Sequence, residues 1–105
     1  MARKTEHGEQ RAAEGRPTGP AWNDAQQAGR NEVLLDTDSE NVIVLGSRGR
    51  VHVFREEQDT LELHTSFRNP RSNTLIRLRT SRWRTLDEAE WESFRQLLER
   101  TLHGS

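Results

Sequence analysis

The spacing of apolar residues along the chain predicts a small β-sheet followed by a single helix. Four segments have the β-branched or alternating composition of strands: 42–45, 50–55, 61–67 and 74–81. The polar turns between these segments are short, which favours antiparallel pairing of consecutive strands. Ordered structure is expected to begin near Glu32, just before the apolar run 33–35.

Helical periodicity appears at the C-terminal end. Apolar side chains recur there in steps of three and four, which places them on one helix face: Trp91, Phe94, Leu97, Leu98 and Leu102. Thr85 and Glu88 have the spacing of a capping box, and His103-Gly104 supplies a stop. The sequence therefore predicts a helix over about 86–102 whose aromatic residues pack against the sheet.

Residues 1–31 have a different composition from the rest of the chain. They lack apolar periodicity and are rich in Gly, Gln, Glu, Ala, Arg and Pro, so they are predicted to form a disordered tail. Residues 32–105 form the predicted domain, an α+β fold with a four-stranded antiparallel sheet followed by one C-terminal amphipathic helix (ββββα). Trp22 either docks on the domain or on a partner, or is a solvated tail residue.

Composition limits the class of protein. The 105 residues leave room for one domain, and a mean hydropathy of -1.01 with 31% charged residues makes the core small. The chain has no cysteine, and its longest aliphatic run, Val42–Leu45, is far shorter than the roughly 20 residues that cross a bilayer. A cytoplasmic protein without a membrane segment or a secretory signal is expected.

Positive charge is concentrated in one part of the chain although the net charge is -1. Six arginines and no acid occur between Arg68 and Arg84, and an acidic block follows directly. Guanidinium groups suit bidentate contacts with phosphate, so the run indicates a nucleic-acid surface. Lysine is scarce in this chain. Codon bias toward arginine explains that scarcity as well as a nucleic-acid surface does.

Strand alternation assigns side chains to the two sheet faces. The inner set comprises Val51, Val53, Leu61, Leu63, Thr65, Phe67, Ile76, Leu78 and Thr80. The opposite set comprises Arg50, His52, Phe54, Glu62, His64, Ser66, Arg77, Arg79, Ser81 and Trp83. Cations and flat rings at strand spacing suit the backbone and unstacked bases of single-stranded nucleic acid. The predicted nucleic-acid-binding residues are Arg50, His52, Phe54, Arg77, Arg79, Arg82, Trp83 and Arg84.

Two alternatives remain open for that face. Its arginines can pair with acids such as Glu62 on a neighbouring strand, as on an ordinary solvated sheet. Because one helix covers only one face, Phe54 and Trp83 can instead mark a surface that is buried between two copies of the protein.

No catalytic or metal-binding motif is found. Serine-nucleophile motifs, a phosphate loop and a dinucleotide fingerprint are absent from the sequence. The four histidines lack metal-ligand spacing, and the acidic turn 36–40 lacks the glycine and terminal glutamate of a calcium loop. The sequence predicts a protein that is not an enzyme and has no cofactor or metal.

The order of elements resembles one known family. Four strands with arginine-rich middles, followed by Thr85-Leu86-Asp87-Glu88-Ala89-Glu90-Trp91, are similar to the single-stranded-DNA-binding domain of the p15 transcriptional coactivator (positive cofactor four) family over about residues 42–102. The resemblance implies a homodimer whose curved sheets hold single-stranded DNA in transcription regulation. It implies a surface lined by Arg50, Phe54, Arg77, Arg79 and Trp83.

Two functional hypotheses follow. The first is a homodimeric nucleic-acid-binding module for single-stranded DNA or RNA, whose affinity falls steeply with salt. The second is a protein-interaction or assembly module without catalytic or nucleic-acid-binding activity, in which the same exposed aromatic side chains bind another chain and the tail supplies a tether through Trp22.

Overall fold

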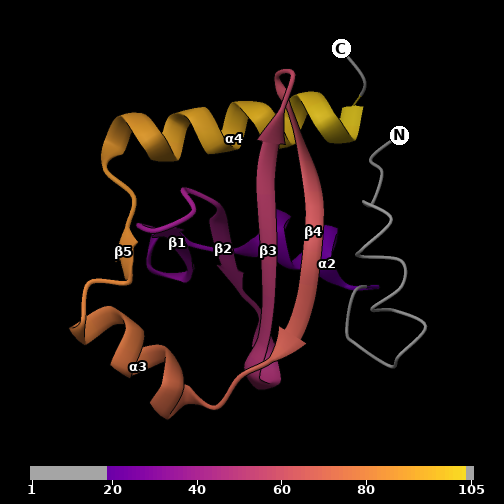
Figure 1. The fold of residues 1–105 in the computed structure, drawn as a ribbon. Helices are drawn as coiled ribbons and strands as arrows, with labels where there is room; N and C mark the ends of the chain where they lie inside the picture. The colour runs from indigo at the N-terminus through magenta and orange to yellow at the C-terminus, as the bar shows by residue number, and fades with distance from the viewer. Residues whose placement is uncertain (1–18, 104–105) are drawn as a thin grey trace.

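The computed structural model describes residues 19–103, and residues 1–18 and 104–105 lie outside the described part of the chain. The fold is α+β, with a five-stranded antiparallel sheet and a long C-terminal helix (Figure 1). The antiparallel sheet and the C-terminal helix were both predicted. The strands Val33–Asp36 and Trp83–Thr85 and two further α-helices were not.

The sheet has the strand order β4-β3-β2-β1-β5. Its strands are β1 (Val33–Asp36), β2 (Val42–Leu45), β3 (Arg50–Glu57), β4 (Thr60–Arg68) and β5 (Trp83–Thr85). Consecutive strands from β1 to β4 pair through short turns, whereas β5 returns after a helix to pair with the outer side of β1. The residue pair Leu34 and Thr85 fixes that last register.

Three α-helices are described, together with two short 3-10 helices. The α-helices are α2 (Ala21–Gln27), α3 (Arg71–Arg79) and α4 (Glu88–His103), and the 3-10 helices are η1 (Arg30–Glu32) and η2 (Ser47–Gly49). Figure 1 shows α4 crossing one end of the long strands β3 and β4, while α3 lies near β5.

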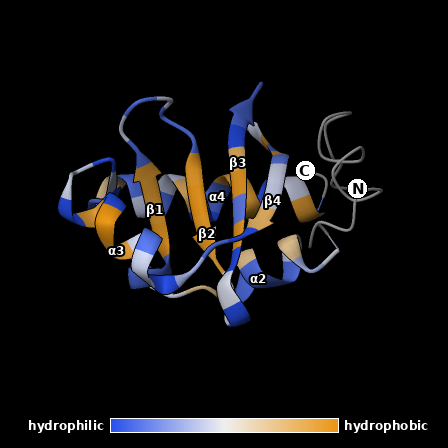
Figure 2. Ribbon diagram, turned by 60° about the horizontal axis from the view of Figure 1, so that its bottom comes forward, coloured by the Kyte–Doolittle hydropathy of each residue, from blue (hydrophilic) through white to orange (hydrophobic). Residues whose placement is uncertain are grey.

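The core has two parts, one on each face of the sheet. The first contains Val33, Val44, Phe54, Leu61 and Leu63 from the strands, packed against buried residues of α2 and α4. The second contains Leu34, Ile43, Val51, Val53 and Trp83. Strand β2 and the first three residues of β1 are therefore apolar on both faces, as Figure 2 shows, which is typical of strands covered on both faces.

Segment 74–81 is not a strand, so that prediction is wrong. Most of it belongs to α3, which follows Pro70 and leaves Leu75 and Leu78 one helical turn apart. The alternation that suggested a strand is short, and a short apolar run does not by itself distinguish a strand from a helix.

The predicted faces of β3 and β4 are also wrong. Val53 pairs with Thr65 whereas Phe54 pairs with Leu63, so β4 has one extra residue at this point. A bulge of this kind reverses which face the following side chains occupy. Phe54 therefore shares the helix-covered face with Leu63, and Val53 lies on the opposite face.

Helix α2 lies within the segment that was predicted to be a disordered tail, so the boundary at residue 31 is too late. Ala21, Ala25 and Ala28 are buried against the sheet, and Trp22 meets Phe54 edge to face with ring centroids 4.9 Å apart. Small residues at this spacing let a short helix lie close to the strands. Of the two interpretations of Trp22, docking on the domain is the one observed.

The C-terminal helix confirms the prediction of an amphipathic helix that packs on the sheet. Phe94 and Leu98 are buried, and Trp91 packs at the edge of the same cluster. Its cap, however, is two residues later than predicted. The Asp87 carboxylate accepts from the Glu90 N–H at 2.7 Å, and the Glu90 carboxylate accepts from the Asp87 N–H at 2.9 Å.

Candidate interaction groove

The aromatic side chains predicted to stack on bases are not on an exposed face. Phe54 and His52 are fully buried beneath α2, and Trp83 is 3% exposed in the second core cluster. The Trp83 indole N–H donates to the Asp36 carboxylate at 3.3 Å. None of these three rings offers a face on which a base could stack.

The predicted arginines are dispersed as well, and three of them are ion-paired. Arg50 pairs with Asp24, Arg82 pairs with Asp36 and Asp38, and Arg84 pairs with Glu90. Arg77 lies over the Trp83 ring at 4.8 Å from its centroid, and Arg79 is exposed at the end of α3. The eight residues therefore do not form one surface.

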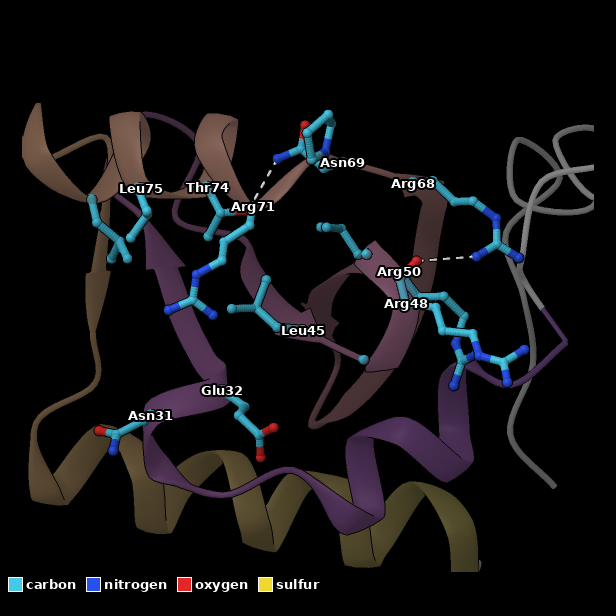
Figure 3. A pocket seen from close by; sticks show the side chains of 15 residues that line it. Asn31, Glu32, Leu45, Arg48, Arg50, Arg68, Asn69, Arg71, Thr74 and Leu75 are labelled. Carbon is cyan, nitrogen blue, oxygen red and sulfur yellow. Dashed lines mark hydrogen bonds between the residues drawn. The ribbon is translucent and has the colours of Figure 1, made fainter.

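A different feature of the described part of the chain is a large hollow. It lies between α3 and the second face of the sheet and has a volume of about 850 Å³ (Figure 3). Its apolar lining comes from β2, β3 and α3, through Leu45, Val51, Leu75 and Leu78. We call this hollow the groove.

The groove exists because α3 does not pack closely on the sheet. The helix has no buried residue, and Leu75, Ile76 and Leu78 are 44%, 52% and 36% exposed. Helical spacing turns Arg71, Thr74, Leu75 and Leu78 toward the groove and leaves Ile76 outside its lining.

Three arginines contribute positive charge to the rim of the groove. Arg48 of η2, Arg68 at the end of β4 and Arg71 at the start of α3 line it, and we call these three residues the arginine rim. Within residues 19–103 none of the three forms an ion pair; the Arg68 guanidinium donates only to the Arg48 carbonyl oxygen, at 3.2 Å. Figure 3 shows Glu32 on a different side of the groove from Arg48 and Arg68.

Sequence analysis missed most of this site. The arginine run that begins at Arg68 pointed to part of the rim, but not to Arg48. The three-residue spacing of Leu75 and Leu78 after Pro70 was the available signal for a helix face here, and it was outweighed by the strand pattern.

A buried polar cluster lies next to the groove wall. The Asp24 carboxylate lies 2.7 Å from His52 Nε2, and His52 Nδ1 lies 2.7 Å from Ser66 Oγ. Arg50 donates two bonds to the same carboxylate, at 2.9 and 3.0 Å. The order of groups is that of a Ser-His-Asp triad, but Ser66 and His52 are fully buried, so no substrate reaches the hydroxyl in this arrangement.

Burial and pairing set the protonation of this cluster. The hydrogen bond from Arg50 is the largest of the effects that lower the pKa of Asp24, so its carboxyl is ionised. Burial lowers the pKa of His52 more strongly than the neighbouring Asp24 raises it, which favours the neutral imidazole. The cluster thus attaches α2 to β3 and β4 through a fixed pattern of hydrogen bonds.

Other classes of site were not found within the described residues. Between residues 19 and 103, no set of three or more His, Cys, Asp or Glu side chains is arranged to hold a metal ion. No helix in the same range has the length and apolar character needed to cross a membrane. Comparisons with family models, with curated proteins and with solved structures found no similar protein.

Proposed function

We propose that the protein is a protein-interaction module that binds a segment of a partner protein in the groove. The carrying observation is an open apolar groove of about 850 Å³ whose helical wall buries none of its own residues. Contiguous exposed apolar surface on a small protein marks an interaction site more often than a solvated surface.

The form of the groove supports a polypeptide ligand. One wall is an α-helix and the floor is a sheet face, so a bound segment would bury aliphatic side chains against Leu45, Val51, Leu75 and Leu78. Grooves of this type recognise segments through a few apolar anchors and tolerate variation elsewhere.

Nucleic-acid binding is the second candidate, and the arginine rim is the observation that favours it. Arg48, Arg68 and Arg71 form no ion pair with residues 19–103, so their guanidinium groups can contact phosphate oxygens. The groove lining contains no aromatic residue, however, so bases would find no stacking platform there. We therefore rank a protein ligand first.

Selection from a phage-displayed random peptide library tests the proposal. Peptides selected on the wild-type protein should bind the Leu75→Glu variant at least about tenfold more weakly. They should bind Ile76→Glu normally, because Ile76 lies on the same helix and is more exposed but does not line the groove. Equal binding to all three proteins would show that the groove is not the binding site.

Titration of labelled single-stranded DNA and RNA at low and moderate salt separates the two candidates. Nucleic acid would be favoured over protein by two results together. Oligonucleotide binding would depend on salt and be lost in an Arg48→Glu variant, and no selected peptide would depend on Leu75. No oligonucleotide binding at low salt would remove the second candidate.

A further inference from the structure

The charge around the groove restricts what can occupy it. The three residues of the arginine rim come from three separate elements and all line the groove; Figure 3 shows Arg48 and Arg68 together on one side and the Arg71 side chain nearer Leu45. Each leaves its guanidinium without an ionic partner in the described part of the chain. A segment lying in the groove would bring its own charged side chains within reach of all three.

A second copy of the protein fits this surface poorly. Helix α3 carries Arg71, Arg77 and Arg79 and no acid. In a symmetric dimer the same patch faces itself, so a contact through α3 and the groove would place arginine against arginine. Like charges facing one another at an interface oppose association.

We propose that the groove binds an acidic peptide segment of another protein. This inference rests on the proposed function and specifies its ligand. Apolar side chains of the segment would lie on the floor beside Leu45 and Leu75, and its Asp or Glu side chains would pair with the arginine rim. Arginine and carboxylate groups form bidentate pairs that give both charge and geometric selectivity.

The acids of the segment should be concentrated toward one end. Glu32 lines the groove away from Arg48 and Arg68, and its carboxylate accepts the Gly29 N–H at 2.8 Å. A ligand carboxylate near Glu32 would be repelled, whereas one near the arginine rim would be attracted. The groove therefore favours one orientation of the bound segment.

The peptides from the phage selection supply the probes for this inference. Sequences that depend on Leu75 should contain aliphatic residues and a cluster of Asp or Glu at one end. Synthetic versions should bind at least about tenfold more weakly to Arg48→Glu and to Arg71→Glu. Exchange of the peptide acids for lysine should weaken binding to the wild-type protein by a similar factor.

Arg100→Glu is the matched control for charge reversal. Arg100 is exposed on α4 outside the groove; it donates to the Asp59 carbonyl oxygen at 3.4 Å and lies 4.0 Å from the Asp59 carboxylate. This variant should therefore bind the acidic peptides almost as tightly as the wild type. The circular dichroism spectrum and thermal midpoint of each variant show whether it is folded.

The outcomes separate this inference from the proposed function. Peptides that need Leu75 but are neutral or basic, or that bind the rim variants normally, would overturn the acidic ligand and leave the groove as an interaction site. Peptides indifferent to Leu75→Glu would overturn both. A concentration-dependent dimer in sedimentation experiments that Leu75→Glu dissociates would identify a second copy as the occupant and overturn the acidic ligand.

Discussion

Replacement of Asp24 by alanine should destabilise the protein through a group that is far away in sequence. The Asp24 carboxylate is the partner of His52 Nε2, and among the described residues no second hydrogen-bond partner of that nitrogen is found. In Asp24→Ala the fully buried imidazole would keep its bond to Ser66 and lose the one to α2. An unsatisfied buried polar group costs about 1–3 kcal/mol, so the free energy of unfolding should fall by about this amount.

Urea unfolding followed by tryptophan fluorescence measures the change, since Trp22 and Trp83 lie on opposite faces of the sheet. Asn23→Ala is the matched control: Asn23 is exposed on the same helix and makes one long bond to Gln27, so its loss should change stability by less than about 0.5 kcal/mol. If Asp24→Ala were as stable as Asn23→Ala, the carboxylate would not hold α2 on the sheet and the argument would be refuted.

Three further predictions concern neighbouring features. Burial lowers the pKa of His52 below 6.5, so as pH falls the unfolded chain binds a proton at this residue before the folded protein does. The free energy of unfolding should therefore decrease as pH drops through 6.5. In urea titrations over a pH series, the free energy of unfolding of His52→Gln should change less steeply with pH than that of the wild type. Gly46→Ala would place its Cβ against the Asp24 carboxylate and should lower the free energy of unfolding by about 1–3 kcal/mol. If the same substitution lowers it much less in an Asp24→Ala protein, the contact with Asp24 is the cause. Asp87→Ala should destabilise by about 1 kcal/mol in thermal unfolding while Thr85→Ala changes little, and the reverse order would support the cap predicted from the sequence.

The parts of the fold predictable from sequence were those with a long or repeated pattern. Helix α4 spans 16 residues with an uninterrupted apolar stripe, so its existence and core-facing side were evident. The turns that connect β2, β3 and β4 were also evident, because short polar segments separate clearly apolar runs. These elements define the α+β class.

The remainder depended on contacts that no local pattern records. Helix α2 is held by Asp24 reaching residues 26 and 28 positions later, and its buried side chains are alanines, which a composition argument does not distinguish from a tail. The bulge in β4 reverses the faces on either side of it. The extra residue places Leu61 and Leu63 on the same face as Phe54, so Phe54 lies in the core and not on a nucleic-acid surface.

The error in the candidate site has the same origin. The prediction assumed a sheet with one apolar face, so any arginine on the other parity was assigned to an exposed surface. Both faces are in fact apolar over β1 and β2, as Figure 2 shows, and most of the predicted arginines pair with local acids. Among the described residues, Arg48, Arg68 and Arg71 form no ion pair, and they lie on α3, a helix that was predicted to be a strand, or across the groove from it.

The same arginines explain why the groove stays open. If α3 moved onto the sheet to bury Leu75 and Leu78, Arg71 would approach Arg48 and Arg68 while losing water. Bringing unpaired like charges together in a less polar setting opposes the gain from covering two partly exposed leucines. A ligand that supplies carboxylates removes this opposition and covers the same leucines. In the proposed complex, the same charge that opposes closure of the groove would therefore also favour an acidic segment.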